Sequence, residues 1–297
     1  MIEPFTEYLL REKNYSPLTV QAYRHDLETF SGFLQDEYGI TSIESTTYQH
    51  IRAWVVQLVE SGVSNRSINR KTSSLNTFFK FLLKIEAIDA SPMAKHKVLK
   101  AGKKVQVPFS EAELQTVLAE LSDASDFTGL RNRLIVELFY ATGIRRIELV
   151  QIKLVNIDLS NRTLKVLGKR NKERYIPLID SVVDTARQYL EARQQLNHIQ
   201  DPDYLFLTQK GLKIYENLVY RIINRYLSNV SSKAKTSPHI IRHTFATHLL
   251  NEGANLNDVK ELLGHTSLAA TQVYTHNSIA ELKKAYASAH PRSNKEK

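Results

Sequence analysis

Cysteine is absent from this sequence of 297 residues, and tryptophan occurs only once. The absence of cysteine excludes disulfide bonds, thiolate metal sites and a cysteine nucleophile, and it fits a reducing compartment. Glycine and proline are scarce, at ten and eight residues, so no long low-complexity linker is expected. Long apolar runs are also missing: LIVELFYAT contains Glu137, and the acidic start MIEPFTEYLLREK does not resemble a signal peptide. We therefore expect a compact cytoplasmic protein that does not cross or bind a membrane.

Basic residues exceed acidic ones by 40 to 31, which gives a formal net charge of +9 and a pI near 9.5. The excess is uneven, because residues 1–62 carry four basic and nine acidic residues, whereas residues 63–104 carry ten basic and two acidic residues. Such a block is often only a solvated surface, but it also suits a polyanion such as nucleic acid. The candidate DNA-binding residues in this block are Arg66, Arg70 and Lys71, with phosphate contacts expected before base contacts.

The first hundred residues have the pattern of helices with defined starts. Ser16 before Pro17 is a favourable helix start, and Gly39 is a suitable stop. A further helix is expected to begin at residue 46 or 47, and a basic helix at Ser64, each with apolar residues at three- and four-residue spacing. The pattern predicts an N-terminal unit of four helices over residues 1–94.

A basic segment, KHKVLKAGKKVQVP, then interrupts the helical pattern. It lacks helical periodicity, contains a glycine and ends in proline, so residues 95–107 are predicted to be an interdomain linker. In the second domain, residues 108–297, Ser110 and Glu113 form a capping box that opens a helix. The stretch IDLSNRTLKVLGKRNKERYIPL alternates apolar and polar residues around two turn signals, and helices return from Ser181. The predicted fold is mainly α, with a small antiparallel β-sheet in the second domain.

The motif PHIIRHTFATHLL, residues 238–250, starts a predicted helix at Pro238. His239 and Arg242 lie on one face of this helix, near its N-terminus. The N-terminus of a helix attracts anions, so this end suits a phosphate. His239 and His243 also have the spacing of a zinc protease motif, but Ile240 stands where that chemistry needs a glutamate. By itself the motif is better explained as an ordinary amphipathic helix with incidental histidines.

Three other segments carry residues that could act on a phosphate. Arg145 in ATGIRRIELV follows a predicted helix, with Glu148 available to orient its guanidinium, and Lys169 in LGKRNKERYIP lies near the tip of a predicted hairpin. The segment LLGHTSLAATQVYTH places His265 nine residues before Tyr274, whose hydroxyl is a candidate nucleophile. Each residue alone has an ordinary alternative, a surface charge or a buried aromatic ring.

Taken together, these residues resemble the tyrosine recombinase, or phage integrase, family. The family pattern is an arginine, a hairpin lysine, a His-x-x-Arg pair, a second histidine and a tyrosine nine residues later, matched here by Arg145, Lys169, His239, Arg242, His265 and Tyr274. RHTFATHLL, LLGH, YTH and AHPR resemble the Xer subfamily in particular. Two positions depart from the pattern: Ile147 replaces a serine or threonine, and Arg170 replaces the second glycine of Gly-Lys-Gly. They bear on rate and on hairpin geometry rather than on the reaction.

The resemblance implies a two-domain clamp, with an N-terminal SAM-like core-binding four-helix bundle and a C-terminal catalytic domain. It also implies DNA cleavage by a tyrosine, with no cofactor and no metal. Phosphodiester cleavage of this kind needs an attached nucleophile, cations for the non-bridging oxygens and an acid for the leaving 5′ oxygen. The implied roles are Tyr274 as nucleophile, Arg145 and Arg242 as the cations, His265 as a hydrogen-bond donor, Lys169 as general acid and His239 as proton acceptor or orienting group.

The resemblance further implies a 3′-phosphotyrosyl intermediate and strand exchange through a Holliday junction by four protomers on two DNA sites. It favours resolution of chromosome dimers with a paralogous recombinase and a cell-division DNA translocase as regulator. An integrase of a mobile element, a type IB topoisomerase-like enzyme and a non-catalytic helical DNA-binding protein are the alternatives. The C-terminal segment IAELKKAYASAH is expected either to dock on a neighbouring protomer or to pack on its own domain.

Overall fold

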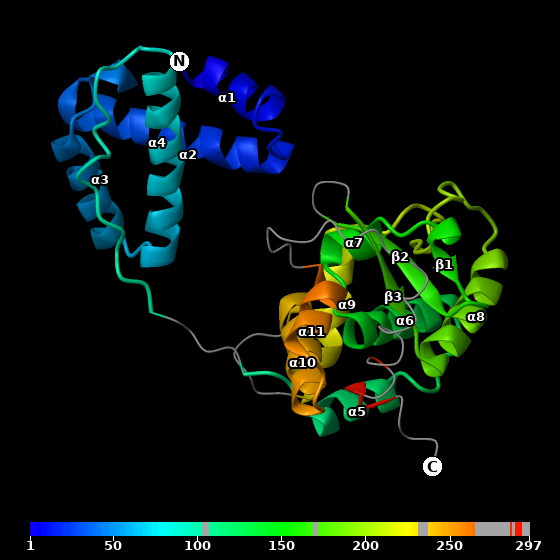
Figure 1. Cartoon of the computed structure of the whole chain (residues 1–297). Helices are drawn as coiled ribbons and strands as arrows, with labels where there is room; N and C mark the ends of the chain where they lie inside the picture. The colour runs from blue at the N-terminus through cyan, green and yellow to red at the C-terminus, as the bar shows by residue number, and fades with distance from the viewer. Residues whose placement is uncertain (103–106, 169–171, 231–236, 265–285, 287–288, 293–297) are drawn as a thin grey trace. The chain divides into compact units, whose positions relative to one another are not determined.

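The computed structural model describes residues 1–102, 107–168, 172–230, 237–264, 286 and 289–292 (Figure 1). It consists of two compact units, Met1–Lys104 and Val105–Lys297, and the boundary between them falls inside the predicted linker. The described residues are mostly helical, and the second unit contains one three-stranded antiparallel sheet, which confirms the predicted fold class. Over the described residues, no helix combines the length and the apolar character that crossing a bilayer requires.

The first unit is built from four helices whose ends follow the predicted signals. The Ser16 hydroxyl accepts a hydrogen bond from the Thr19 amide at 3.3 Å, and Gly39 ends the same helix with φ of 65°. Thr47 and Ser64 are the N-caps of the next two helices, as predicted. The elements are α1 (Ile2–Arg11), α2 (Pro17–Tyr38), the short 3₁₀ helix η1 (Ile43–Ser45), α3 (Tyr48–Glu60) and α4 (Asn65–Lys84).

Large aromatic side chains fill the core of the first unit. Phe5 of α1 meets Phe78 of α4 edge to face, with 5.2 Å between ring centroids, and Trp54 of α3 lies 5.0 Å from the Phe30 ring of α2. These four side chains are almost completely buried. Each such burial stabilises the fold by roughly 1.5–3 kcal/mol, so the aromatic contacts hold α1 and α3 on the α2–α4 pair.

The first part of the predicted linker is attached to α4. The Asn69 side chain donates to the Leu99 carbonyl at 2.8 Å and accepts from the Leu99 amide at 2.9 Å. One turn earlier, Asn65 donates to the Lys100 carbonyl at 2.9 Å. Because an asparagine amide that both donates to and accepts from one residue fixes its backbone, the linker follows α4 as far as Lys100.

The second unit packs its helices around α6, which is buried along most of its length. The predicted capping box opens α5, where the Ser110 amide donates to Glu113 at 2.7 Å and the Glu113 amide donates to the Ser110 hydroxyl at 3.2 Å. The helices are α5 (Glu111–Glu120), α6 (Phe127–Thr142), α7 (Arg146–Val150), η2 (Leu154–Asn156), α8 (Asp180–Gln194), α9 (Glu216–Val230), α10 (Pro238–Asn251) and α11 (Leu256–Leu263).

The sheet of the second unit forms from the predicted segment. Its strands, in the spatial order β1-β2-β3, are β1 (Ile157–Asp158), β2 (Thr163–Leu167) and β3 (Glu173–Pro177). In the β2–β3 hairpin, Val166 pairs with Arg174, and the Gly168 amide donates to the Lys172 carbonyl at 2.7 Å at the base of the connecting loop. Helix α7 lies beside β2 and helix α11 beside β3, so the hairpin is held between these two helices (Figure 1).

The described part of the C-terminal segment packs on its own unit. Tyr286 and Ala289 belong to the core of the second unit, and His290 is fully buried. The Tyr286 hydroxyl donates to the carbonyl of Ala141, near the end of α6, at 2.7 Å. The rest of the segment IAELKKAYASAH lies outside the described residues, so docking on a neighbouring protomer stays a prediction for it.

Candidate active site

A sharp corner between α6 and α7 positions Arg145. Gly143 ends α6 with φ of 58°, and a Cβ at this position would lie 2.5 Å from the Phe245 ring and 2.7 Å from Leu263. Glycine is therefore needed both for the left-handed backbone and for the close packing. Two residues later Arg145 is the N-cap of α7, and its amide donates to the Glu148 carboxylate at 2.9 Å. The same carboxylate accepts from the Arg145 guanidinium at 2.7 Å, as the sequence indicated.

Arg242 reaches the same corner from α10. Its Nη1 donates to the Gly143 carbonyl at 2.5 Å, and its Nη2 donates to the Leu263 carbonyl at 2.6 Å. The side chain is buried, and burial together with the nearby positive charge of Arg145 lowers its pKa to about 10. Arg242 thus holds two backbone carbonyls while keeping its charge at neutral pH.

The end of α11 completes the meeting point of these elements. Helix α11 stops at Gly264, which has φ of 64°, and the Gly264 carbonyl accepts from Arg145 Nη2 at 3.2 Å. Arg242 holds the carbonyl of the preceding residue, Leu263. The α6–α7 corner, α10 and the end of α11 are therefore connected by two guanidinium groups, which we call the arginine pair (Arg145 and Arg242).

A buried ion pair lies behind the arginine pair. Arg174 of β3 donates from Nη1 and Nη2 to the two oxygens of Glu148, each at 2.9 Å, and from Nε to the Leu262 carbonyl at 2.9 Å. Burial alone would raise the pKa of Glu148, but the hydrogen bonds from Arg174 and Arg145 outweigh it and hold that pKa below its ordinary value. Glu148 is therefore ionised at neutral pH, between two arginines.

Sequence reasoning did not select Arg174, although a signal for it exists. Residues two apart in a strand share a face, so Arg174 lies on the same side of β3 as the buried Ile176. An arginine on the buried face of a strand needs an acidic or carbonyl partner, because an unpaired buried charge is very costly. That partner is Glu148, already assigned to Arg145 and 26 positions away in the sequence.

Of the four other predicted catalytic residues, the structure describes only His239. His239 is exposed in the first turn of α10, one turn before the buried Arg242. Lys169, His265 and Tyr274 lie outside the described residues. In the sequence Lys169 directly follows Gly168 at the base of the hairpin, and His265 directly follows Gly264 at the arginine pair.

Of the two departures from the family pattern, Ile147 is among the described residues and Arg170 is not. Ile147 is exposed on α7, where its side chain is 48% accessible and takes no part in the core. Arg170 lies outside the described residues. The apolar side chain at 147 is therefore compatible with the fold of α7, and its effect on the reaction stays a prediction.

The three candidate DNA contacts lie on α4 and differ in their surroundings. Arg70 forms two hydrogen bonds with the Asp26 carboxylate, at 2.5 and 2.7 Å, and Lys71 donates to it at 3.2 Å. Asp26 is completely buried, and Ser74 also donates to it. Arg66, one turn before Arg70, is exposed. Arg70 and Lys71 thus have a structural partner inside the first unit, and about half of the Arg70 side chain still faces solvent.

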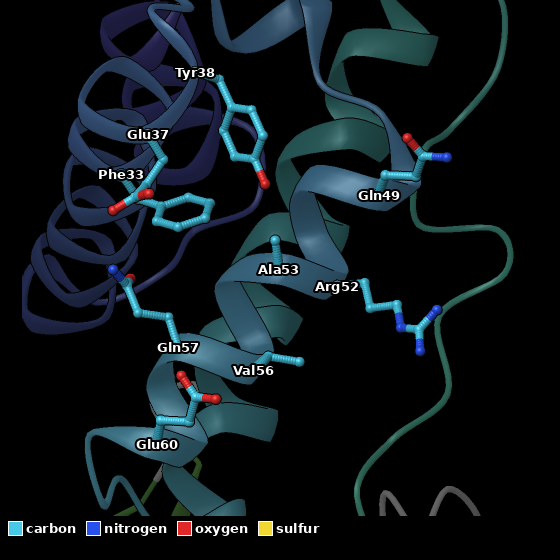
Figure 2. Close-up of a pocket in the computed structure, with 9 residues that line it drawn as sticks. All are labelled: Phe33, Glu37, Tyr38, Gln49, Arg52, Ala53, Val56, Gln57 and Glu60. Carbon is cyan, nitrogen blue, oxygen red and sulfur yellow. The ribbon is translucent and has the colours of Figure 1, made fainter.

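The first unit also has a surface hollow of about 660 Å³ between α2 and α3 (Figure 2). Phe33, Tyr38 and Val56 give it an apolar lining, and Glu37 and Glu60 are among its charged residues. Two carboxylates against one arginine, Arg52, do not suit a phosphate.

Nowhere in the described part of the chain are three histidine or acidic side chains grouped as metal ligands would be, and this includes the surroundings of His239 and His243.

Comparison with known proteins places both units in one family. The model of the phage integrase family matches residues 109–281, and the model of its N-terminal SAM-like domain matches residues 2–85. The chain is 39% identical to tyrosine recombinase XerC of Oceanobacillus iheyensis, covering 99% of this chain and 96% of the relative. It is 38% identical to tyrosine recombinase XerC of Bacillus subtilis, covering 98% and 96%.

A solved structure shares the fold as well. The XerH site-specific recombinase, crystallised on a palindromic difH substrate as a post-cleavage complex, superposes with a TM-score of 0.73 at 24% identity. The match covers 97% of this chain and 84% of that one. At this level of identity the likeness concerns the fold, whereas the family models and the curated relatives identify the kind of protein.

Proposed function

The chain belongs to the phage integrase family and is a tyrosine-type site-specific DNA recombinase, and we propose that Tyr274 is the nucleophile with which it cleaves DNA. The observation that carries this proposal is the arginine pair. Two guanidinium groups from distant parts of the chain meet at the end of α11, immediately before the segment that contains His265 and Tyr274. Planar, permanently charged donors of this kind suit the two non-bridging oxygens of a phosphodiester.

In the proposed reaction the Tyr274 hydroxyl oxygen attacks the scissile phosphorus. A bond forms between Oη and phosphorus, the bond from phosphorus to the 5′ oxygen breaks, and a 3′-phosphotyrosyl intermediate results. Arg145 and Arg242 stabilise the negative charge that accumulates on the non-bridging oxygens in the transition state. Attack by a 5′ hydroxyl from another strand reverses the same steps, so the bond energy is conserved and the chain's own side chains suffice.

Two proton transfers accompany the proposed cleavage, one from the tyrosine hydroxyl and one to the leaving 5′ oxygen. His239, exposed at the start of α10, accepts the tyrosine proton or orients the hydroxyl, and Lys169 gives a proton to the leaving 5′ oxygen. His265 adds a hydrogen bond to a non-bridging oxygen. A tyrosine has a reference pKa near 10, so it becomes a good nucleophile only where nearby cations favour the phenolate.

The partner is double-stranded DNA carrying a recombination site. We propose that Arg66 and the exposed part of Arg70 contact its phosphates, while Lys71 mainly holds Asp26. Four protomers are proposed to act on two sites through a Holliday junction, together with a paralogous recombinase and under a cell-division DNA translocase. Near-complete coverage of relatives named XerC supports resolution of chromosome dimers as the biological task. The origin of the cleaved site distinguishes this from integration of a mobile element.

The test is covalent trapping on nicked duplexes. The duplexes carry candidate sites from the protein's own chromosome or from the ends of its mobile elements, with a chelator present throughout. A nick next to the scissile phosphate lets the short cleaved strand diffuse away, so the attached protein accumulates and resists SDS. Wild-type protein is expected to form the complex, and Tyr274→Phe is expected to bind the duplex equally well without attachment.

A matched control separates this nucleophile from other tyrosines. Tyr220 on α9 is an exposed tyrosine of the same unit, so Tyr220→Phe should trap DNA as well as the wild type does. If wild type and Tyr274→Phe both bind and neither becomes attached, Tyr274 is not the nucleophile on these sites. Attachment that persists in Tyr274→Phe would assign the nucleophile to another residue.

A further inference from the structure

Arg174 contacts Glu148, the residue that orients Arg145, and it does so in a way that fixes the carboxylate completely. Glu148 Oε1 accepts from Arg174 Nη1 at 2.9 Å and from Arg145 Nη1 at 2.7 Å. Oε2 accepts from Arg174 Nη2 at 2.9 Å and from the Arg145 amide at 2.9 Å. Both oxygens are therefore shared, and neither can rotate toward Arg145 without breaking a bond to Arg174.

The Arg174 guanidinium is itself fixed from three sides. Its Nε donates to the Leu262 carbonyl at the end of α11. A Cβ at Gly264 would lie 3.1 Å from Nη1 and 3.3 Å from Cδ and Cζ, and a Cβ at Gly168 would lie 3.6 Å from Nη1. Glycines thus stand on both flanks where the guanidinium passes closest to the backbone. Only 5% of the side chain is accessible, so its position is set by packing and by three hydrogen bonds at once.

We propose that Arg174 is a positioning residue that holds the Glu148 carboxylate in the one orientation that aims Arg145 at the scissile phosphate. Arg174 does not touch DNA in this role. It transmits the position of β3 and of the end of α11 to Arg145, so that the arginine pair stays aligned. The inference rests on the proposed function, because it takes Arg145 as a cation for the phosphate.

The variant Arg174→Lys keeps the positive charge beside Glu148 but removes the planar fork. A lysine has a single nitrogen, so it cannot hold both carboxylate oxygens and the Leu262 carbonyl together. Glu148 then gains freedom to rotate, and Arg145 moves with it. Misplacement of a catalytic group by about 1 Å can cost roughly a hundredfold in rate. We expect single-turnover cleavage of an ordinary phosphodiester to slow by about tenfold to a hundredfold.

A substrate with a methylphosphonate at the scissile position gives the readout that loss of structure would not. Replacing one non-bridging oxygen by methyl removes the negative charge that the arginine pair must balance, so cleavage depends less on Arg145. We expect Arg174→Lys to cleave this substrate within about threefold of the wild-type rate on the same substrate. Arg145→Ala should show the same relief, which ties the two residues to one step.

The matched control is Arg193→Lys. Arg193 is a buried arginine of α8 that donates to the carbonyls of Pro202 and Tyr204, at 2.8 and 3.0 Å, and it lies outside the proposed site. Any slowing that comes only from a loosened second unit should therefore be equal on both substrates. Thermal unfolding of each variant, measured in parallel, shows how far stability itself has changed.

Each outcome decides the matter. Equal slowing of Arg174→Lys on both substrates would reduce Arg174 to a structural role, and no slowing on either would deny it any role. A third substrate, with a 5′-bridging phosphorothiolate, has a sulfur leaving group that needs no proton. If this substrate restores the cleavage rate of Arg174→Lys and the methylphosphonate does not, Arg174 serves the leaving group instead. If Arg145→Ala itself gains no relief from the methylphosphonate, the proposed role of Arg145 is wrong and the positioning role falls with it.

Discussion

Replacing Arg242 by lysine should give cleavage an additional pH dependence that the wild type does not have. Burial and the charge of Arg145 lower the pKa of Arg242 to about 10, well below the usual value for arginine. Arginine has enough margin to stay charged through the neutral range in spite of this. Lysine in the same place starts from a reference pKa of about 10.4 and has no such margin.

The same surroundings would bring the pKa of a lysine at position 242 to roughly 8. A lysine also has one nitrogen, so it cannot hold the Gly143 and Leu263 carbonyls together, and losing one of these contacts lowers the pKa further. The charged form exists below the pKa and is lost as the pH rises through it. Between pH 7 and pH 9 the variant should therefore lose about tenfold more activity than the wild type.

The assay is the second-order rate of covalent attachment with enzyme well below saturation, because this rate reports the pKa values of the free enzyme. Rates are compared as the ratio of variant to wild type at each pH, which cancels every pH effect that the two proteins share. Arg187→Lys, a substitution at an exposed arginine of α8, should give a ratio that does not change with pH. A ratio for Arg242→Lys that stays flat from pH 7 to pH 9 would refute the argument that burial at this position depresses the pKa.

Two further predictions concern the first unit. Burial opposes ionisation of Asp26, but hydrogen bonds from its basic and hydroxyl partners hold its pKa below the ordinary value, so its stabilising effect is present at neutral pH and lost in acid. Asp26→Asn should cost about 2–4 kcal/mol in the free energy of unfolding at pH 7, and urea unfolding should show less difference below about pH 4. Replacing Asn65 and Asn69 together by alanine removes their hydrogen bonds to the linker, so the connection, now residues 101–108, should lengthen to about twelve residues. A longer connection lowers the effective concentration of one unit for DNA bound by the other, so the Kd for a full DNA site should rise about twofold. The exposed Ser73→Ala on the same helix should leave the Kd unchanged.

The sequence predicted the local features of this fold well because the interactions that determine them are local. An N-cap such as Ser16, or the capping box at Ser110, is made by side chains and amides three residues apart, so the pattern is visible in a short window. The antiparallel hairpin follows in the same way from alternation and a turn. The short spacing from Arg145 to Glu148 likewise indicated Glu148 as the partner of that arginine, and the family pattern then indicated which charged residues to consider together.

The contacts that the sequence did not predict join residues far apart in the chain. Arg174 and Glu148 are separated by 26 positions, and Arg70 and Asp26 by 44. A basic residue in a charged stretch has the same appearance whether it faces DNA or neutralises a buried carboxylate. Only the packing of α4 on α2 shows that part of the basic block is needed inside the protein. Of the three candidates, Arg66 and about half of the Arg70 side chain stay exposed to solvent, whereas Lys71 is largely buried.

The charges at the site explain why it should prefer the transition state to the bound DNA. Arg145, Arg174 and Arg242 meet there with Glu148, whose lowered pKa keeps it ionised, so these four groups carry two net positive charges. Burial lowers the pKa of Arg242, and repulsion from the charge of Arg145 lowers it further. A phosphodiester brings one negative charge, which leaves one positive charge without a counterpart. In the proposed reaction the second negative charge on the non-bridging oxygens develops only as Tyr274 attacks. The remaining attraction would then be realised in the transition state, where it lowers the barrier instead of tightening ground-state binding.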